Sequence, residues 1–293
     1  MRILTDPVLA ERTTLRLGGA AIAEIILEDE RDLDGLQVQL ASLGGEALVL
    51  GEGSNVLAKD GRLPLVLVRL VQPGEPEVLE TGRDFALIQV PAALRLPRLL
   101  AWCRSRGFGG LEQWTGIPGS VGGAVAMNAG SYGVEMVHVL EQVRIWTPTQ
   151  GCVWKEAADM EFGYRRFDSG MDDALQIVVA IRLRLGLSTP SMIRNRMQQW
   201  YGRKKQTQPV TMASAGCVFK NPAPEQPAGK LLDQAGLRGF ELGKMAFSDK
   251  HANFLVNLGG GSASDAFELL DMARERVWKH FGVALATEVR IIP

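Results

Sequence analysis

Glycine is concentrated in one segment of the chain, GIPGSVGGAVAMNAGSYG, from Gly116 to Gly133. Six of its eighteen residues are glycine, against a typical usage of about 7 %. Glycine is needed where the backbone takes a positive φ or approaches another group closely, so a dense run indicates main chain wrapped around a ligand. The segment has no lysine, which a P-loop needs, and we expect backbone N–H groups to hold an anion here. A mobile linker is the alternative, but linkers are polar and this run carries Ile117, Val121 and Val125.

A second glycine-containing turn, Gly51 to Leu57 (GEGSNVL), follows an expected strand. It differs from the dinucleotide-binding fingerprint because Val56 stands where the third glycine belongs, and the next residues return to a strand instead of opening a helix. A plain turn is one interpretation. A Gly-x-Gly-Ser-Asn turn can also direct N–H groups and two polar side chains at a phosphate, so the two segments together suggest one bound diphosphate.

Composition places the chain among ordinary globular proteins, with 46 % apolar and 22 % charged residues. Its 293 residues are enough for two or three compact units. The 32 basic and 33 acidic residues give a net charge of −1, so no general field attracts a polyanion. Nucleic acid and anionic membranes are therefore poor candidate partners.

The compartment can be inferred from the N-terminus and from the cysteines. Asp6, Pro7 and Glu11 interrupt the apolar core that a secretory signal needs, and no run approaches the roughly 20 apolar residues of a membrane helix. We therefore expect a cytoplasmic protein. The three cysteines lie far apart without a C-x-x-C pair, and the three histidines are equally scattered, so we expect neither disulfides nor a metal site. The cysteines are Cys103, Cys152 and Cys217.

Short β-rich runs bounded by turns fill the first two thirds of the chain and would position the glycine-rich segments. They are residues 47–50, 65–70, 85–90, 143–146 and 177–185. A short helix is predicted between them, with Pro97 in its first turn and Gly107 just past its end. Cys103 lies on the apolar face of this helix and is most simply a core residue.

The pattern changes at residues 186–191, where we place a domain boundary. Thr189 and Pro190 are expected to begin a helix that ends near Gly202. A second helix is expected from Ser264 to Gly282, followed by a closing strand over residues 287–292. Its expected buried residues are Phe267, Leu270, Val277 and Phe281. The predicted class is α+β, with a mostly β first part and a smaller α+β C-terminal domain.

Seven segments in order carry a resemblance to a known family: RTTLRLGG, GEGSNVL, GIPGSVGGAVAMNAGSYG, FGYRR, SAGCVFKNP, SDKHANFLVN and EVRII. They are similar to the UDP-N-acetylenolpyruvoylglucosamine reductases, also called UDP-N-acetylmuramate dehydrogenases. The resemblance implies a two-lobed FAD-binding domain of the PCMH type, with lobes at residues 1–70 and 71–188. A substrate-binding domain follows at 189–293, and its C-terminal strand returns to the active site. No insertion follows FGYRR. In this the chain resembles the shorter subtype of the family, which lacks a mobile tyrosine-bearing loop.

The resemblance also implies the activity. NADPH would reduce noncovalently bound FAD, and the reduced flavin would reduce the enolpyruvyl double bond of UDP-N-acetylglucosamine enolpyruvate. The product, UDP-N-acetylmuramate, is a peptidoglycan precursor, so roles in cell wall biogenesis, cell shape and cell division follow. The partner is a small nucleotide-sugar, and no obligate protein partner is evident.

Three catalytic positions are carried over from the family. Arg165 resembles the arginine that holds the enolpyruvyl carboxylate, and a guanidinium suits a carboxylate or enolate. Glu288 matches a C-terminal glutamate that orients the arginine or serves as an acid. Cys217 stands where the family most often has serine, and a thiol can deliver the proton to carbon. Without the resemblance, the three would be a surface arginine, a surface glutamate and a small core residue. Phe167 also departs from the family, which usually has serine there.

The remaining expected contacts follow the same resemblance. FAD would be bound by Gly51, Gly53, Ser54, Asn55, Ile117, Pro118, Gly119, Ser120, Gly122, Gly123 and Asn128. The substrate would be bound by Tyr164, Lys205, Lys220 and Asn221, with Lys204 as a further diphosphate candidate.

Two alternatives stay open from the sequence. One is another flavin oxidase on the same two-lobed scaffold, because a fold does not determine its function. Such oxidases often tether FAD through His or Cys, and neither residue occurs in the two glycine-rich segments. The other is a nonenzymatic nucleotide-sugar-binding module.

Overall fold

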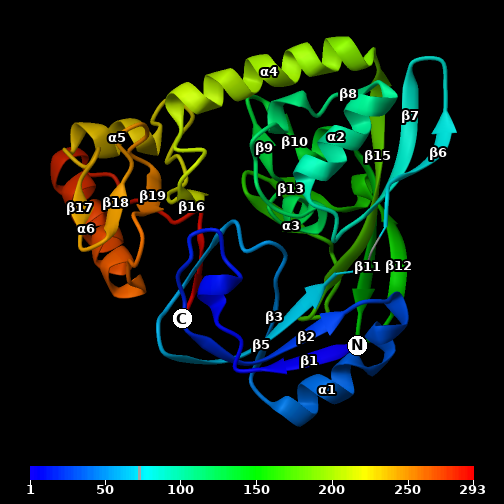
Figure 1. Cartoon of the computed structure of the whole chain (residues 1–293), viewed down its shortest axis with the longest axis horizontal. Coiled ribbons are helices and arrows are strands. Elements are labelled where there is room, and N and C mark those ends of the chain that lie inside the picture. Colours follow the sequence, from blue (N-terminus) through cyan, green and yellow to red (C-terminus); the bar gives the residue numbers. More distant parts are fainter. Residues whose placement is uncertain (72–73) are drawn as a thin grey trace. The chain divides into compact units, whose positions relative to one another are not determined.

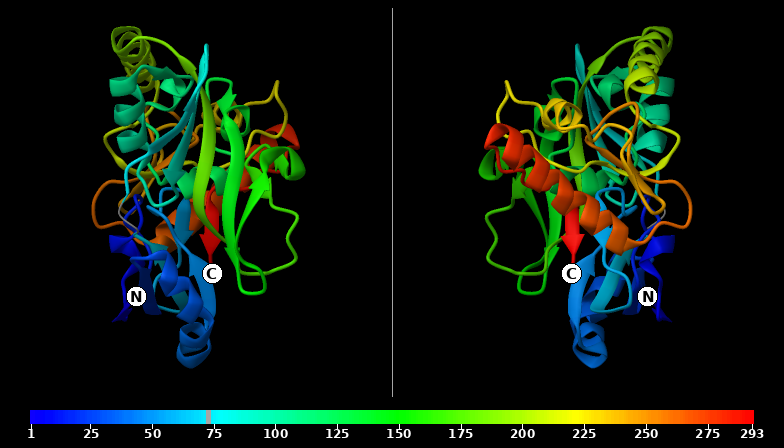
Figure 2. Two further views of the ribbon diagram at one scale, coloured as in Figure 1. Left: turned by 90° about the vertical axis from the view of Figure 1, so that its right-hand side faces the viewer. Right: turned by 90° about the vertical axis from the view of Figure 1, so that its left-hand side faces the viewer.

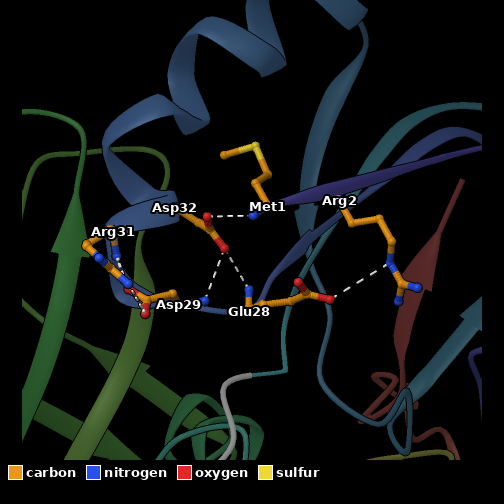
Figure 3. A network of polar contacts seen from close by, with 6 residues as sticks. All are labelled: Met1, Arg2, Glu28, Asp29, Arg31 and Asp32. Carbon is orange, nitrogen blue, oxygen red and sulfur yellow. Dashed lines mark hydrogen bonds and ion pairs between the residues drawn. The ribbon is translucent and has the colours of Figure 1, made fainter.

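The computed structural model describes residues 1–71 and 74–293. Its first sheet has four strands in the order β1-β2-β5-β3, with β1 antiparallel to β2 and β3 parallel to β5. The strands are β1 (Arg2–Thr5), β2 (Ala20–Leu27), β3 (Glu46–Val49) and β5 (Arg62–Leu70). Between β2 and β3, a capping box at Asp29 and Asp32 opens a short 3-10 helix that leads into α1 (Leu36–Leu43). Asp32 also accepts hydrogen bonds from the Glu28 N–H and the Met1 ammonium, which lowers its pKa (Figure 3).

The second sheet contains the longest strand of the described residues (Figure 2), and every neighbouring pair in it is antiparallel. Its order is β12-β11-β15-β7-β6, with β8 added beside β15. The strands are β6 (Glu77–Thr81), β7 (Phe85–Pro91), β8 (Phe108–Gly109), β11 (Leu140–Thr147), β12 (Gly151–Glu156) and β15 (Ile177–Leu187). The five predicted strand runs are confirmed across the two sheets.

Two helices pack their apolar faces on the second sheet, α2 (Leu96–Arg106) and α3 (Val121–Ala126) (Figure 1). The prediction of α2 is confirmed: Pro97 lies in its first turn and Gly107 ends it with a φ of 76°. Cys103 is buried in the core beneath it, as expected. Two short hairpins flank this core. They are β9 (Gly130–Ser131) with β10 (Val134–Glu135), and β13 (Glu161–Gly163) with β14 (Arg166–Asp168).

The third sheet is antiparallel in the order β16-β19-β18-β17, with α5 and α6 on its apolar side. Its elements are β16 (Ala213–Cys217), α5 (Ala228–Gln234), β17 (Glu241–Leu242), β18 (Met245–Phe247), β19 (Phe254–Asn257) and α6 (Ala263–Phe281). A separate parallel pair joins β4 (Val56–Ala58) to β20 (Arg290–Ile292).

Three expectations about the C-terminal third were wrong in detail. The helix that begins at Pro190, α4 (Pro190–Thr207), runs past Gly202 because the polar residues after this glycine favour helix. The helix α6 is capped by Ser262 and begins at Ala263, and its Phe281 is 38 % exposed. The closing strand covers only β20, because Thr287 forms an isolated bridge and Glu288 lies in a bend.

Backbone contacts divide the described residues into two compact units. The first unit comprises Met1–Thr5, Ala23–Glu52 and Leu65–Gly202, and the second comprises Asp6–Ile22, Gly53–Pro64 and Arg203–Pro293. The division into 1–70, 71–188 and 189–293 remains a prediction. None of the helices in the described part of the chain is both long and apolar enough to cross a membrane.

Candidate active site

The glycine-rich segment forms a bend followed by the short helix α3 in the first unit. Gly116 and Gly119 take φ values of 87° and 123°, which other residues rarely adopt. Ser120 caps α3 and accepts a hydrogen bond from the Gly123 N–H at 3.2 Å. Gly123 itself is exposed, and a Cβ there would meet only the Ser120 hydroxyl, at 3.2 Å. Main chain is therefore open to a ligand at this glycine.

Several N–H groups of this segment are already used by the protein. The Val121 N–H donates to the Leu94 carbonyl at 2.9 Å, and the Gly122 N–H donates to the Ala92 carbonyl at 2.8 Å. An anion at this bend would therefore meet the backbone that precedes Val121, around Gly119 and Ser120. The exposed Pro118 and half-buried Ile117 border the same stretch.

The other glycine turn meets this segment within the first unit. A Cβ on Gly51 would lie 2.3 Å from the Ser120 hydroxyl, so the two glycine-rich segments touch at a point where any larger residue would displace that hydroxyl. Next to it, Glu52 pairs with Arg95 at 2.9 Å. Arg95 precedes Leu96, whose N–H donates to the Gly119 carbonyl. The expected adjacency of the two segments is thus confirmed at Gly51.

The rest of that turn belongs to the second unit. Gly53 has a φ of 58°, and a Cβ on it would lie 2.1 Å from the Arg12 carbonyl. Ser54 is half-buried beside it. The Asn55 amide donates to the Glu288 carbonyl at 3.2 Å, and the Asn55 carbonyl accepts from the Arg290 N–H at 3.0 Å. Asn55 therefore joins this turn to the C-terminal segment.

Arg165 lies in the tight turn of the β13–β14 hairpin. Gly163 pairs with Arg166, which leaves Tyr164 and Arg165 as the two turn residues. Arg165 has a φ of 56°, a region where glycine or asparagine is preferred. Its guanidinium makes a long hydrogen bond of 3.5 Å to the Gly130 carbonyl and lies 4.9 Å from the Tyr164 ring centroid. The turn therefore holds a cation beside the glycine-rich segment.

Phe167 supports this hairpin. Its ring lies 5.3 Å from the ring of Phe162, its cross-strand neighbour, and both rings pack on the core of the first unit. Phe167, which stands where the family usually has serine, thus forms an aromatic pair beneath the Arg165 turn in place of a polar group.

Cys217 and Glu288 lie on neighbouring backbone segments of the second unit. Cys217 ends β16, directly after Gly216 with its φ of 81°. The carbonyl of the next residue, Val218, accepts hydrogen bonds from the Glu288 N–H at 2.7 Å and the Val289 N–H at 3.3 Å. Glu288 is half-buried, and so is Cys217. A thiol and a carboxylate are therefore carried on segments joined by hydrogen bonds.

Asn253 holds the same segment from its other side, and the sequence did not indicate that contact. Its amide donates to the Phe219 carbonyl at 2.8 Å, and its oxygen accepts from the Phe219 N–H at 2.9 Å. The side chain is 2 % exposed, and it bonds the N–H and the carbonyl of Phe219 in the way that a neighbouring strand would. Asn253 is the second residue after His251 in the segment SDKHANFLVN, but its partner is 34 residues away.

The expected substrate residues differ in exposure. Asn221 is exposed and its oxygen accepts from the Ala228 N–H at 3.0 Å, while the half-buried Lys220 donates its N–H to the Ala286 carbonyl. Lys205 is exposed, and its carbonyl accepts from the Lys250 ammonium. Lys204 is 2 % exposed, and burial lowers its pKa to about 8. Its side chain is therefore packed inside the unit.

Comparison with known proteins accounts for nearly the whole chain. A family model described as UDP-N-acetylenolpyruvoylglucosamine reductase, C-terminal domain, matches residues 208–292, and an FAD binding domain model matches residues 23–155. The reductase of Nitratidesulfovibrio vulgaris is 48 % identical over 100 % of this chain and 99 % of its own length. That of Oleidesulfovibrio alaskensis is 48 % identical over 99 % of this chain and 98 % of its own length.

A solved structure agrees with these matches. The crystal structure of the reductase from Thermus caldophilus is 33 % identical, covers all of both chains and has a TM-score of 0.82. The α+β class, with an FAD-binding domain ahead of a smaller C-terminal domain, is thereby confirmed. On this identity and coverage, the chain belongs to the UDP-N-acetylenolpyruvoylglucosamine reductase family.

Proposed function

We propose that this chain is the NADPH-dependent flavoenzyme that reduces UDP-N-acetylglucosamine enolpyruvate to UDP-N-acetylmuramate. The proposal rests on one observation: the chain is 48 % identical over its entire length to a UDP-N-acetylenolpyruvoylglucosamine reductase. The strained turn that carries Arg165 beside the glycine-rich segment gives independent support, because strain of this kind is concentrated at functional positions.

The residues of the glycine-rich segments fit a flavin dinucleotide. The exposed Gly123 leaves backbone accessible to a diphosphate, while the positive φ of Gly119 and the capping hydroxyl of Ser120 shape the bend beside it. In the first unit the proposed FAD contacts are Gly51, Ile117, Pro118, Gly119, Ser120, Gly122 and Gly123, and in the second they are Gly53, Ser54 and Asn55. FAD, when bound, supplies hydride transfer from NADPH to the enolpyruvyl double bond.

The chain's own residues supply charge and a proton. Arg165 binds the substrate carboxylate through its guanidinium and stabilises the enolate charge that develops there when hydride is added to the methylene carbon of the double bond. The Cys217 Sγ–H gives its proton to the carbon that bears the carboxylate. Glu288 acts on the same substrate group by orienting the guanidinium or as an alternative acid.

The remaining contacts recognise the nucleotide-sugar. We assign the diphosphate and sugar to Tyr164, Lys205, Lys220 and Asn221. The first three offer an exposed phenol and two ammonium groups, which suit a diphosphate and a sugar hydroxyl. We place the reaction in the cytoplasm, in peptidoglycan precursor synthesis, where loss of activity would affect cell shape and division.

An anaerobic absorbance experiment tests the proposal. The purified protein should be yellow, lose its flavin absorbance on addition of NADPH and recover it on addition of UDP-N-acetylglucosamine enolpyruvate. Precipitation with acid should release the flavin. Flavin that stays on the precipitated protein would favour a tethered flavin oxidase, and flavin that NADPH does not bleach would favour a nonenzymatic binding module.

A further inference from the structure

Asn128 lies at the centre of a buried polar network in the first unit. It is 1 % exposed and has a φ of 38°. Its amide nitrogen donates to the Gly163 carbonyl at 3.1 Å and to the Glu135 carboxylate at 3.0 Å. Its oxygen accepts from the Val137 N–H at 3.1 Å. One side chain thus joins the glycine-rich segment to the β13–β14 hairpin, to Glu135 at the end of β10 and to Val137 just after it.

The hairpin contact is made at a specific point. Gly163 is the residue directly before the Tyr164–Arg165 turn, so the hydrogen bond to its carbonyl holds the first end of the turn in place. The guanidinium of Arg165 in turn reaches the carbonyl of Gly130, two residues after Asn128. The turn that carries Arg165 is therefore tied to the same segment at the Gly163 carbonyl and at the tip of the Arg165 side chain.

Glu135 completes the anchor. A Cβ on Gly130 would lie 2.7 Å from Cγ of Glu135, so the glycine leaves the space through which this side chain reaches Asn128. Both hydrogens of the Asn128 amide then have acceptors, and the amide is fixed in one orientation. A fully satisfied buried amide of this kind holds the backbone around it in one arrangement.

We propose that Asn128, braced by Glu135, is a positioning residue for Arg165. Its amide holds the turn that keeps Arg165 at a positive φ, and so places the guanidinium for the substrate carboxylate. The inference rests on the proposed role of Arg165 and replaces a direct side-chain contact between Asn128 and FAD. Displacement of a catalytic group by about 1 Å can cost roughly 10²-fold in rate.

The test uses Asn128→Gly, which accepts the positive φ but removes all three hydrogen bonds. FAD content and the rate of flavin reduction by NADPH should stay within about two-fold of the parent, while reoxidation by the enolpyruvyl substrate should fall by roughly 10-fold to 10²-fold. Gln176→Ala is the matched control, because the Gln176 amide also makes three hydrogen bonds, to Met171, Asp173 and Ser169. That variant should retain both rates.

A double-mutant cycle separates positioning from general support. If Asn128 acts through Arg165, Asn128→Gly should slow reoxidation no further in an Arg165→Ala background. Glu135→Ala should reproduce the effect of Asn128→Gly, and it carries the same test if the glycine variant does not fold. Glu135→Gln keeps an acceptor for Asn128 and should restore most of the rate.

Three results would overturn the inference. Loss of FAD in Asn128→Gly, with Gln176→Ala still yellow, would assign the side chain to the cofactor. Multiplicative loss in the double variant would make Asn128 a structural residue alone. An Arg165→Ala enzyme that reoxidises at the parent rate would remove the proposed role of Arg165 and, with it, the reason to position it.

Discussion

The backbone conformation of the turn residue Arg165 lowers stability but places its guanidinium beside the glycine-rich segment. A non-glycine residue at positive φ costs on the order of 1 kcal/mol or more, and such strain persists only where the surrounding structure holds it. Here the holding groups are the Asn128 amide and the cross-strand pair of Phe162 and Phe167. A glycine would relieve the strain but would lack the charge, so the residue type is set by chemistry and the conformation by its neighbours.

Substitution at this position should separate stability from activity. Arg165→Asn and Arg165→Ala both remove the guanidinium, so both should slow reoxidation by substrate by roughly 10²-fold. Asparagine tolerates positive φ and alanine does not, so Arg165→Asn should be the more stable of the two by about 0.5 to 1 kcal/mol in chemical denaturation. The exposed neighbour is the control: Arg166→Ala should keep the parent's rate. Equal stabilities for the two variants would show that the turn relaxes when the guanidinium is lost.

The proton donor can be tested at Cys217. Cys217→Ser should keep much of the activity, while Cys217→Ala should still be reduced by NADPH but should not be reoxidised by substrate. Serine and alanine are similar in size, so packing does not explain a gap between them. The measurement is the rate of each half-reaction by stopped-flow absorbance. An alanine variant as fast as the parent would make Cys217 a packing residue and require another acid.

Alkylation gives an independent measurement at the same residue. Burial raises the pKa of Cys103 to about 12, and burial together with the nearby Glu30 carboxylate raises that of Cys152 to about 11. Because the thiolate is the reactive form, neither should react quickly at neutral pH. Peptide mapping after iodoacetamide treatment should therefore find the label at Cys217, and substrate should protect it.

Three asparagines show where sequence reasoning stops at the residue scale. Asn55 and Asn128 were predicted as FAD contacts, but the backbone partners of Asn55, Asn128 and Asn253 were not predicted. Their amides bond backbone groups 233, 35 and 34 residues away. A spacing pattern carries no information about such partners, because they are brought together only by the fold.

At the scale of elements, strands and caps followed from local signals. The apolar runs predicted five strands, and Pro97 and Gly107 marked both ends of α2 because their backbone preferences act locally. The helix α4 was longer than predicted, since a lone glycine at 202 weakens a helix without ending it. In the β13–β14 hairpin, Tyr164 and Arg165 occupy the two turn positions where glycine or asparagine is common. The sequence therefore carries no local turn signal for this hairpin.

The aromatic pair beneath that hairpin should contribute measurably to stability. A double-mutant cycle with Phe162→Leu and Phe167→Leu should give a coupling free energy of about 0.5 to 1.5 kcal/mol, since tilted ring pairs add this much beyond burial. The measurement is the change in free energy of unfolding for the two single variants and the double variant. FAD content should not change. A coupling near zero would mean that the two rings contribute only through separate burial.

At the scale of the whole molecule, the chain order and the compact units do not coincide. Residues 6–22 and 53–64 group with the C-terminal segment, and β4 pairs with β20 across more than two hundred residues. The sequence predicts consecutive ranges, because composition and periodicity detect only neighbours along the chain. The resemblance to the reductases supplied the expectation that the C-terminal strand returns, which no local pattern contained.

The buried Lys204 predicts how stability depends on pH. Its pKa is about 8 in the folded chain, lowered by burial, against 10.5 for an exposed lysine. Between these two values the unfolded chain binds more protons than the folded one, so the free energy of unfolding should rise with pH from about 8 to 10.5. Below pH 8 the ammonium is charged in both states and this contribution is constant. The rise is roughly 3 kcal/mol at most.

Comparison of two methionine variants isolates that contribution from other groups that titrate in the same range. Lys204→Met keeps the buried aliphatic stem and removes the charge, so its free energy of unfolding should exceed the parent's at pH 7.5, and the difference should shrink as the pH approaches 10.5. Lys205→Met is the control, because it removes the same charge at the exposed neighbouring position. Urea unfolding of the flavin-free protein at a series of pH values provides the measurement. A constant difference for Lys204→Met would mean that Lys204 keeps an ordinary pKa in the folded chain.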